Sequence, residues 1–225
     1  MVHVIKNIRR PSAEILKGFF TLASATIHEA SGRKGYIDCA IKPINRGLRI
    51  CGPAFTVQCA PGDNLMLHKA LECAQPGDVI VADVGGAYDY GYFGNLMATS
   101  ALARGVGGLC IDGCIRDGAE IIAGGFTIFS RGFCIRGTNK ATIGIINYPT
   151  LFGGQMIFPG DLMVGDDDGL VVVRLDECED VLQKARDRVA KEVEKESVLK
   201  TGVSSVEFNK LGPVMEKAGL VEEQG

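Results

Sequence analysis

The sequence predicts an α/β fold, and three observations lead to that class. Apolar runs of strand length alternate with segments of helical spacing through the middle of the chain. At 76–78 and again at 159–161, a Pro-Gly-Asp turn leads directly into an apolar strand. Thirty of the 225 residues are glycine, which indicates many tight turns or close approaches of the backbone to a ligand.

The first third of the chain is expected to form a helix, two strands and a second helix. Residues 11–30 have apolar side chains at helical spacing, and Ser12 stands where it would cap the start. Residues 35–44 and 50–60 have the composition of strands interrupted by proline and glycine. After a turn, residues 65–74 return to helical spacing.

The rest of the chain continues the alternation. In order, we expect a helix from the N-cap Asn95 to the terminator Gly105, a strand at 106–112, a short helix at 116–125, a strand at 126–135, an acidic hairpin turn at 166–168 and a long charged helix at 176–202. This last helix keeps an apolar stripe formed by Val181, Leu182, Ala185 and Val189.

Bulk composition argues against several classes of protein. The formal net charge of −3 gives no electrostatic reason to expect nucleic acid or an anionic membrane as partner. No stretch is long enough to span a bilayer, and the N-terminus lacks the apolar region of a signal peptide, so we expect a cytoplasmic protein. The eight cysteines contain no CxxC pair and only three histidines occur, which argues against a zinc site.

Two glycine-rich stretches invite comparison with nucleotide- or S-adenosylmethionine-binding loops. These stretches, 83–91 and 105–110, both lack the GxGxxG spacing, and the second precedes a strand instead of following one. The sequence therefore gives little support for a nucleotide cofactor.

The segment from Gly91 to Gly94 leads into the helix expected at Asn95. Its backbone N–H groups and the helix dipole would bind a carboxylate or phosphate, although a plain Asn95 cap explains the same residues. Elsewhere in the chain, the adjacent residues Asp63 and Asn64 are of types common in turns, and a turn is sufficient to explain their presence.

Four charged residues follow a buried strand in the stretch 112–121, DGCIRDGAEI. In a structural interpretation, Asp117 caps the next helix and Glu120 completes a capping box. In a functional interpretation, the stretch lies at the carboxyl end of a parallel strand, where α/β proteins bind ligands. Arg116 would then grip a carboxylate or enolate, and Asp117 would hold a hard divalent cation. The residues alone leave both interpretations open.

Several linked motifs together resemble the RraA-like family, which contains the regulator of ribonuclease activity and the 4-hydroxy-4-methyl-2-oxoglutarate/4-carboxy-4-hydroxy-2-oxoadipate aldolases. The motifs occupy residues 25–35, 52–83, 91–117 and 159–173. The likeness extends over about residues 5–200, and the stretches TIHEASGR and APGDN are closest to the aldolase branch.

The resemblance implies an RraA-like α/β sandwich of the swivelling phosphohistidine-domain type. One such domain would occupy residues 1–225, with 176–225 as a helical C-terminal extension. Subunits would form a homotrimer, or a homohexamer made of two trimers, with active sites between neighbours. The enzymes of this family are class II pyruvate aldolases that need Mg²⁺ or Mn²⁺.

The resemblance also implies a set of site residues. Asp117 would anchor the metal, largely through its water shell, and Arg116 would contact the keto oxygen that becomes an enolate. The backbone amides of Leu96 and Met97 would receive the substrate carboxylate. The remaining positions are Glu29 as a catalytic residue, Asn64 and His68 as substrate-binding residues, and Glu192 of a neighbouring subunit near the metal.

One position departs from the aldolase pattern. Twenty-one positions before the arginine, the aldolases carry an aspartate that moves protons through a water, and this chain has Asn95. An amide is not a general base. Retro-aldol cleavage needs a base for the substrate hydroxyl, whereas oxaloacetate decarboxylation needs only the enolate and a proton donor. We therefore expect Asn95 to impair aldolase action more than decarboxylation, unless Glu29 or a metal hydroxide substitutes.

These features predict a divalent-metal-dependent carbon–carbon lyase on 2-oxo acids. It would cleave a 4-hydroxy-2-oxo dicarboxylate to pyruvate, or decarboxylate oxaloacetate. The alternative is a protein that inhibits ribonuclease E by binding it, and a third possibility is a homologue with an empty site. The aldolase-like stretches at 26–33 and 60–64 favour the enzyme.

Overall fold

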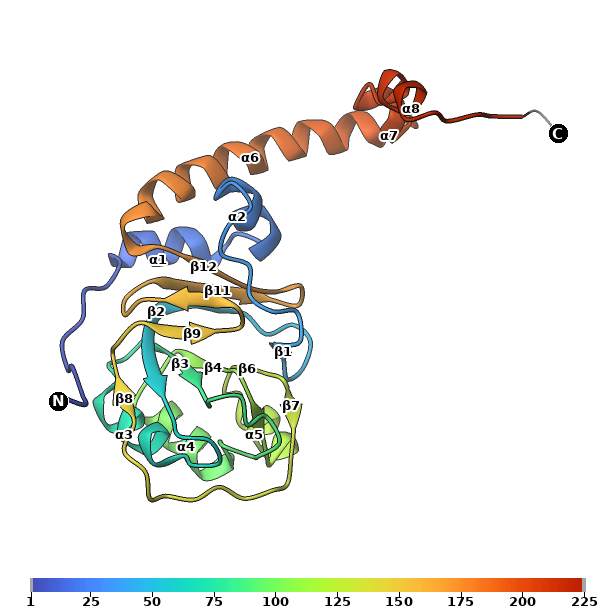
Figure 1. Cartoon of the computed structure of the whole chain (residues 1–225). Coiled ribbons are helices and arrows are strands. Elements are labelled where there is room, and N and C mark those ends of the chain that lie inside the picture. The colour runs from blue at the N-terminus through green and yellow to red at the C-terminus, as the bar shows by residue number, and fades with distance from the viewer. Residues whose placement is uncertain (1, 224–225) are drawn as a thin grey trace. The chain divides into compact units, whose positions relative to one another are not determined.

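The computed structural model describes residues 2–223, and its central feature is an eight-stranded sheet that nearly closes into a barrel. The strand order is β1-β6-β4-β3-β2-β11-β12, with β8 paired to β2. The strands are β1 Lys42–Pro43, β2 Ile50–Gln58, β3 Val79–Asp83, β4 Gly108–Ile111, β6 Ile128–Ser130, β8 Ile145–Ile146, β11 Leu162–Asp166 and β12 Gly169–Val173. The Lys42 ammonium donates to the Asp168 carbonyl at 2.6 Å and so brings the two ends of the sheet together (Figure 1).

Parallel strands form the middle of the sheet and antiparallel strands its ends. β2, β3, β4 and β6 run parallel, whereas β11 and β8 lie antiparallel to β2, β12 to β11 and β1 to β6. Parallel strands are covered on both faces and therefore read as continuous apolar runs. The α/β class expected from the sequence is confirmed.

Three helices cover one face of the parallel strands, namely α3 Leu65–Cys73, α4 Asn95–Ala103 and α5 Gly118–Gly124 (Figure 1). Side chains alternate across the sheet, because successive residues of a strand point to opposite faces. Phe55 and Val57 pack against these helices, whereas Ala54 joins a second core inside the near-barrel. The strand-to-helix connections of this layer carry the candidate site.

A third core lies between β11, β12 and the helices α1 Ala13–Phe20, α2 Ser24–Ala30 and the start of α6 Cys178–Leu199. The Ser12 cap is confirmed, since its hydroxyl accepts from the Ile15 N–H at 3.3 Å. The single helix expected over 11–30 is wrong, because the chain breaks into two helices. Asp166 accepts both the N–H and the hydroxyl of Ser24, at 2.7 and 2.6 Å, and thereby starts α2 anew.

Two other strand expectations need correction. Of residues 35–44, only β1 is a strand, apart from a single bridge between Tyr36 and Val171. The strand expected over 126–135 divides into β6 and β7 Gly132–Phe133. β7 pairs in parallel with β5 Cys114–Ile115, and a separate hairpin is formed by β9 Thr150–Phe152 and β10 Gln155–Ile157.

The Pro-Gly-Asp turns have the geometry that their sequence predicts. Gly77 and Gly160 have φ of +86° and +89°, the left-handed conformation required at the third position of a type II turn. The acidic turn between β11 and β12 is also confirmed, with Asp166 paired to Gly169.

The chain forms two compact units, Met1–Ala185 and Arg186–Gly225. α6 Cys178–Leu199 begins in the first unit after the 3-10 turn Leu175–Glu177, and its first turns bury Val181, Leu182 and Ala185. The second unit contains the rest of α6 together with α7 Ser205–Phe208 and α8 Gly212–Lys217. Over residues 2–223, no helix is both long and apolar enough to cross a membrane.

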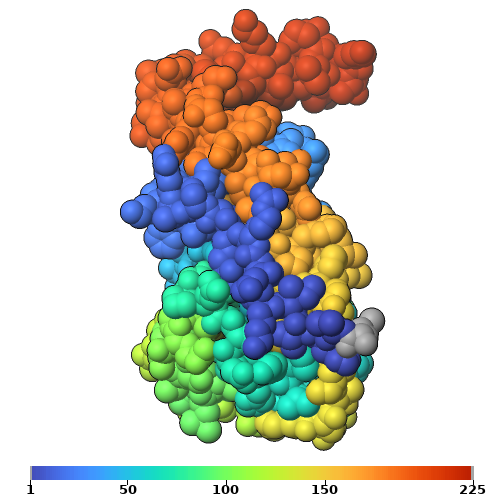
Figure 2. Space-filling view, turned by 90° about the vertical axis from the view of Figure 1, so that its left-hand side faces the viewer, coloured from blue at the N-terminus to red at the C-terminus, as the bar shows by residue number. Residues whose placement is uncertain are grey.

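The N-terminal segment runs along the surface of the first unit, shown in dark blue in Figure 2. Its backbone adds to β8 through the Ile5 N–H, which donates to the Ile146 carbonyl at 3.2 Å. Further along, the Arg10 guanidinium makes two hydrogen bonds of 2.7 and 2.8 Å to the fully buried carboxylate of Asp78. This segment is therefore an integral part of the first unit.

Candidate functional site

Arg116 and Asp117 lie in the short connection between β5 and α5. Asp117 has φ of +59°, a left-handed conformation that is uncommon for residues other than glycine and that concentrates at functional sites. Asp117 occupies the N-cap position of α5 as expected, but its side chain caps no amide of that helix. The predicted capping box with Glu120 is therefore wrong. The Asp117 Oδ2 atom instead accepts the N–H of Asn95, at 3.0 Å.

The start of α4 lies directly against this pair. The N-cap of α4 is Gly94 and not the expected Asn95, which is the first helical residue. A Cβ atom on Gly94 would lie 2.6 Å from Asp117 Oδ2 and 3.2 Å from Arg116 Nε. Glycine at this position therefore lets Arg116 and Asp117 approach the backbone closely, and any side chain here would displace them.

The Arg116 guanidinium and the Asp117 carboxylate do not form a close ion pair with each other. The distance from Arg116 Nε to Asp117 Oδ2 is 3.9 Å, and the two side chains are 49% and 42% exposed. Within residues 2–223, no hydrogen bond reaches the Asp117 Oδ1 atom or leaves the Arg116 guanidinium. Both groups are therefore available to a ligand.

Arg116 and Asp117 line a cavity of about 270 Å³ whose walls come from α3, the start of α4 and the segment 137–140. The cavity also brings together most of the residues expected from the sequence, namely Asn64, His68, Leu96 and Met97. Asn95, the other expected catalytic residue, does not line this cavity, but its backbone N–H binds the Asp117 carboxylate that does.

Amides at the start of α4 face this cavity. First-turn N–H groups of a helix have no intrahelical acceptor, and the helix dipole favours an anion beside them. The Met97 N–H is already partly engaged, since it turns back to the Gly94 carbonyl at 3.0 Å. The Leu96 N–H is therefore the better of the two predicted amides for a substrate carboxylate.

The opposite wall carries an amide oxygen and an imidazole. The Asn64 side chain donates to the Tyr92 carbonyl at 2.8 Å, while its Oδ1 is buried without a donor in the described part of the chain. Burial and the nearby charge of Lys140 lower the pKa of His68, so that this imidazole is neutral at pH 7. An orphaned buried acceptor is unusual and suggests that a donor arrives with a ligand.

Lys140 is the residue of this cavity that sequence reasoning missed. It lines the same cavity as Arg116 and Asp117 and lies close enough to His68 to influence its ionisation. Nothing in the local sequence around Lys140 distinguishes it from an exposed loop lysine. A contact between segments so far apart in the chain becomes visible only in the folded structure.

Two expected site residues lie elsewhere in the chain. Glu29 stands on α2, where one of its carboxylate oxygens lies 3.2 Å from Arg33 Nε. Glu192 stands on the part of α6 that belongs to the second unit and pairs with Arg188 at 2.8 Å. Neither residue lines the cavity of Arg116 and Asp117.

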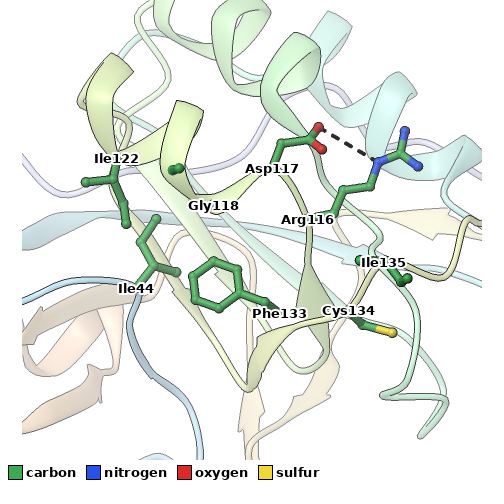
Figure 3. A pocket seen from close by; sticks show the side chains of 9 residues that line it. Ile44, Arg116, Asp117, Gly118, Ile122, Phe133, Cys134 and Ile135 are labelled. Carbon is green, nitrogen blue, oxygen red and sulfur yellow. Dashed lines mark ion pairs between the residues drawn. The ribbon is translucent and has the colours of Figure 1, made fainter.

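A larger, mostly apolar cavity of about 680 Å³ adjoins the same pair. Ile44, Ile122 and Phe133 face one another across it, and the polar ends of Arg116 and Asp117 point away from them (Figure 3). The polar chemistry of the site therefore belongs to the smaller cavity.

The donor set of the smaller cavity suits a hard divalent cation held by few protein ligands. Asp117 supplies its one carboxylate, and the described residues contain no group of three histidine, cysteine or acidic side chains placed to hold a metal. Mg²⁺ commonly binds through one or two carboxylates and keeps several waters. The residues present thus fit Mg²⁺ or Mn²⁺ on Asp117, completed by water and substrate oxygens, and do not fit a structural zinc site.

Comparison with known proteins finds the RraA-like family, described as Aldolase/RraA, over residues 22–172. A protein of Halalkalibacterium halodurans named "Putative 4-hydroxy-4-methyl-2-oxoglutarate aldolase" is 38% identical over 193 residues, which cover 86% of this chain and 92% of that protein.

Two solved structures share the fold. RraAS2 of Streptomyces coelicolor, described as an unusual member of the RNase ES inhibitor RraA family, has a TM-score of 0.76 at 29% identity and covers 84% of this chain and 99% of its own. An uncharacterized protein of Pseudomonas syringae pv. tomato has a TM-score of 0.78 at 28% identity and covers 90% of this chain and 100% of its own.

Proposed function

Because the chain belongs to the RraA-like family, we propose that it is a divalent-metal-dependent carbon–carbon lyase acting on small 2-oxo acids. The observation that carries this proposal is the pair Arg116 and Asp117, held against the start of α4 with both groups open to one cavity. The relative from H. halodurans supports an aldolase-type reaction.

The substrate that suits this cavity is an anion with a 2-oxo acid end. Its carboxylate would lie at the first turn of α4 and accept the Leu96 N–H. The Arg116 guanidinium would donate to the keto oxygen and stabilise the negative charge that develops there, a type of interaction worth several kcal/mol in a shielded site. Mg²⁺ or Mn²⁺ on Asp117 would add positive charge beside the same oxygen.

Lys140 gives the cavity a second cationic group besides Arg116. A substrate with a second carboxylate would then be bound at both ends, by the first turn of α4 and by Lys140. We therefore propose a 4-hydroxy-2-oxo acid with at least two carboxylates, namely the dicarboxylate 4-hydroxy-4-methyl-2-oxoglutarate or the tricarboxylate 4-carboxy-4-hydroxy-2-oxoadipate, or else oxaloacetate. In retro-aldol cleavage the hydroxyl at C4 loses its proton, the C3–C4 bond breaks, and its electron pair forms pyruvate enolate. In decarboxylation the bond between C3 and the leaving carboxylate breaks to give the same enolate, which then takes a proton at C3.

A coupled assay for pyruvate tests this proposal. The wild-type protein should release pyruvate from oxaloacetate or a 4-hydroxy-2-oxo dicarboxylate when Mg²⁺ is present, and chelation should remove the activity. Arg116→Ala and Asp117→Ala should each abolish pyruvate formation, because one removes the oxyanion donor and the other the anchor of the cation. Near-full rates in either variant would refute the assignment.

A second candidate function is inhibition of a ribonuclease by direct binding, which the similarity to RraAS2 supports. Capture of ribonuclease E by this protein, together with no pyruvate release from any substrate, would favour that function. A protein with neither activity, whose melting temperature is unchanged by Mg²⁺ and the enolate mimic oxalate, would have an empty site, because a bound ligand raises stability.

A further inference from the structure

The motif Pro-Gly-Asp-Asn at 61–64 contains a buried carboxylate that the chemistry above does not use. Asp63 is only 3% exposed, and its sequence context suggested no more than a turn. Its Oδ1 accepts the N–H of Leu65 in the first turn of α3, at 2.8 Å. Its Oδ2 accepts the N–H groups of Ala141 and Thr142, at 2.7 and 3.0 Å.

These three hydrogen bonds join two adjacent walls of the candidate cavity. One wall is the start of α3, which carries Asn64 and His68. The other is the segment that carries Lys140, immediately before the two amides that Asp63 binds. The backbone supports the same junction, since Asn139 donates to the Gly62 carbonyl and accepts the Asn64 N–H, at 2.8 and 3.0 Å.

The other end of the Lys140 segment is held through its backbone, where the Gly91 N–H donates to the Arg136 carbonyl at 2.8 Å, and through an exposed ion pair. There the guanidinium of Arg136 lies 2.6 Å from the carboxylate of Asp89, but the two side chains are 56% and 71% exposed. Exposed ion pairs contribute little because water screens them. The buried carboxylate of Asp63, which accepts three amide hydrogen bonds, is a firmer side-chain attachment than this ion pair, and its loss leaves those three amides without their acceptor.

We propose that Asp63 is a positioning residue that fixes Lys140 near His68 and thereby makes the site select substrates with a second anionic group. Asp63 itself touches no substrate in this account. The role of Lys140 in substrate selection rests on the proposed lyase function, whereas its fixation by Asp63 does not.

The ionisation of His68 reports where Lys140 lies, because the lysine charge lowers the pKa of that imidazole. We would titrate His68 by NMR in the wild type, Lys140→Ala, Asp63→Asn and the double variant. Lys140→Ala should raise the pKa of His68. Asp63→Asn, which keeps the size of the side chain but loses an acceptor, should raise it in the same direction. The double variant should add nothing beyond Lys140→Ala.

Asp89→Asn is the matched control, because it removes the carboxylate that pairs with Arg136 at the exposed end of the Lys140 segment. It should leave the His68 titration unchanged. A folded Asp63→Asn protein with the wild-type pKa at His68, or a double variant in which the two effects add, would overturn the positioning role.

A second measurement does not depend on the stability of a variant. In the wild type, the amides of Ala141 and Thr142 should exchange with deuterium far more slowly than an exposed loop, although both residues lie at the surface. Exchange of both amides at the rate of unstructured peptide would equally overturn the proposal.

Steady-state kinetics separately test whether the position of Lys140 makes the site select substrates with a second anionic group. Asp63→Asn should raise KM for 4-hydroxy-4-methyl-2-oxoglutarate about tenfold, the size expected when a charge-assisted contact is lost. Its kcat, and its KM for a 4-hydroxy-2-oxo monocarboxylate, should change less than twofold. An equal change in KM for both substrates would refute a role of Lys140 in substrate selection, even if the His68 titration shows that Asp63 fixes the position of Lys140. If no substrate yields pyruvate, the proposed function fails while the titration still decides the positioning role.

Discussion

Arg116 and Asp117 are neighbours, yet the Asp117 side chain and the Arg116 backbone are held by contacts other than the mutual attraction of the two charges. Their separation of 3.9 Å exceeds the roughly 2.7–2.9 Å of a charge-assisted hydrogen bond. Since both are largely exposed, their attraction is worth about 0–1 kcal/mol. Asp117 is fixed by the Asn95 N–H, and the backbone N–H of Arg116 donates to the Phe93 carbonyl at 3.0 Å. Because their mutual attraction is weak, the two side chains can bind a ligand with little loss of free energy from separating the pair.

Asn95 permits a test at the level of a single side chain. Asn95→Asp supplies a carboxylate that can accept the proton of a substrate hydroxyl through a water, which the amide cannot do. We expect the ratio of aldolase to oxaloacetate decarboxylase rates to rise, by at least the lower end of the roughly 10²–10⁴-fold range typical of general bases. Parallel assays of pyruvate release from both substrates measure that ratio.

Asn209→Asp, a change of the same charge in the second unit, should leave the ratio unchanged. If Asn95→Asp leaves it unchanged as well, then Asn95 is not the cause of any aldolase deficit, and another group serves as the base.

At this scale, the sequence identified most of the residues that line the cavity, Asn64 and His68 included, and missed Lys140 and the role of Asp63. Arg116, Asp117 and the amides of Leu96 and Met97 belong to local motifs, and they do line one cavity. Lys140 and the role of Asp63 depend on hydrogen bonds between residues about 80 positions apart, such as Asp63 to Thr142. No sequence window contains both partners, so only the fold reveals the junction.

At the scale of elements, the key arrangement is the start of α4 pressed against the turn between β5 and α5. The Asp117 carboxylate stands at the N-cap position of α5, but it accepts the Asn95 N–H at the start of α4 and caps no amide of α5. Sequence rules for caps assume that a capping side chain serves its own helix. That assumption explains why the structural interpretation of Asp117 as the start of a capping box fails.

Gly94→Ala tests this arrangement. The added Cβ would meet Asp117 Oδ2 at 2.6 Å and so displace the pair from the helix start. A shift of about 1 Å in a catalytic group costs on the order of 10²-fold in rate, so pyruvate formation should fall by about that factor while circular dichroism stays unchanged.

Gly124→Ala, at the end of the neighbouring α5, is the matched control, since its Cβ would meet no atom within 4 Å. Activity in this control should match the wild type. Full activity in Gly94→Ala would show that the close approach of Asp117 to α4 is unimportant for catalysis.

At the scale of the whole molecule, periodicity predicted the layers but not their closure. The alternating apolar pattern and the Pro-Gly-Asp turns correctly indicated an α/β sheet covered by helices. Closure toward a barrel depends on the contact of Lys42 with the β11–β12 turn, and the break before α2 depends on Asp166. Both are long-range contacts that local patterns do not encode.

The cavity of one chain contains a single carboxylate, whereas the resemblance implies two further acids, Glu29 and Glu192. Both stand outside that cavity, on α2 and α6. We propose that a homotrimer, alone or paired as a hexamer, completes each site with acids from a neighbouring subunit. The number of subunits is accessible by mass photometry.

A crystal structure of the wild-type protein grown with Mg²⁺ and oxalate tests the central claim most directly. Oxalate stands in for the enolate of pyruvate, and we predict that it accepts hydrogen bonds from the Arg116 guanidinium and the Leu96 N–H while sharing a cation with Asp117. Oxalate and Mg²⁺ bound away from these groups, or an Asp117 carboxylate engaged only with the Asn95 N–H in the presence of both, would contradict the account.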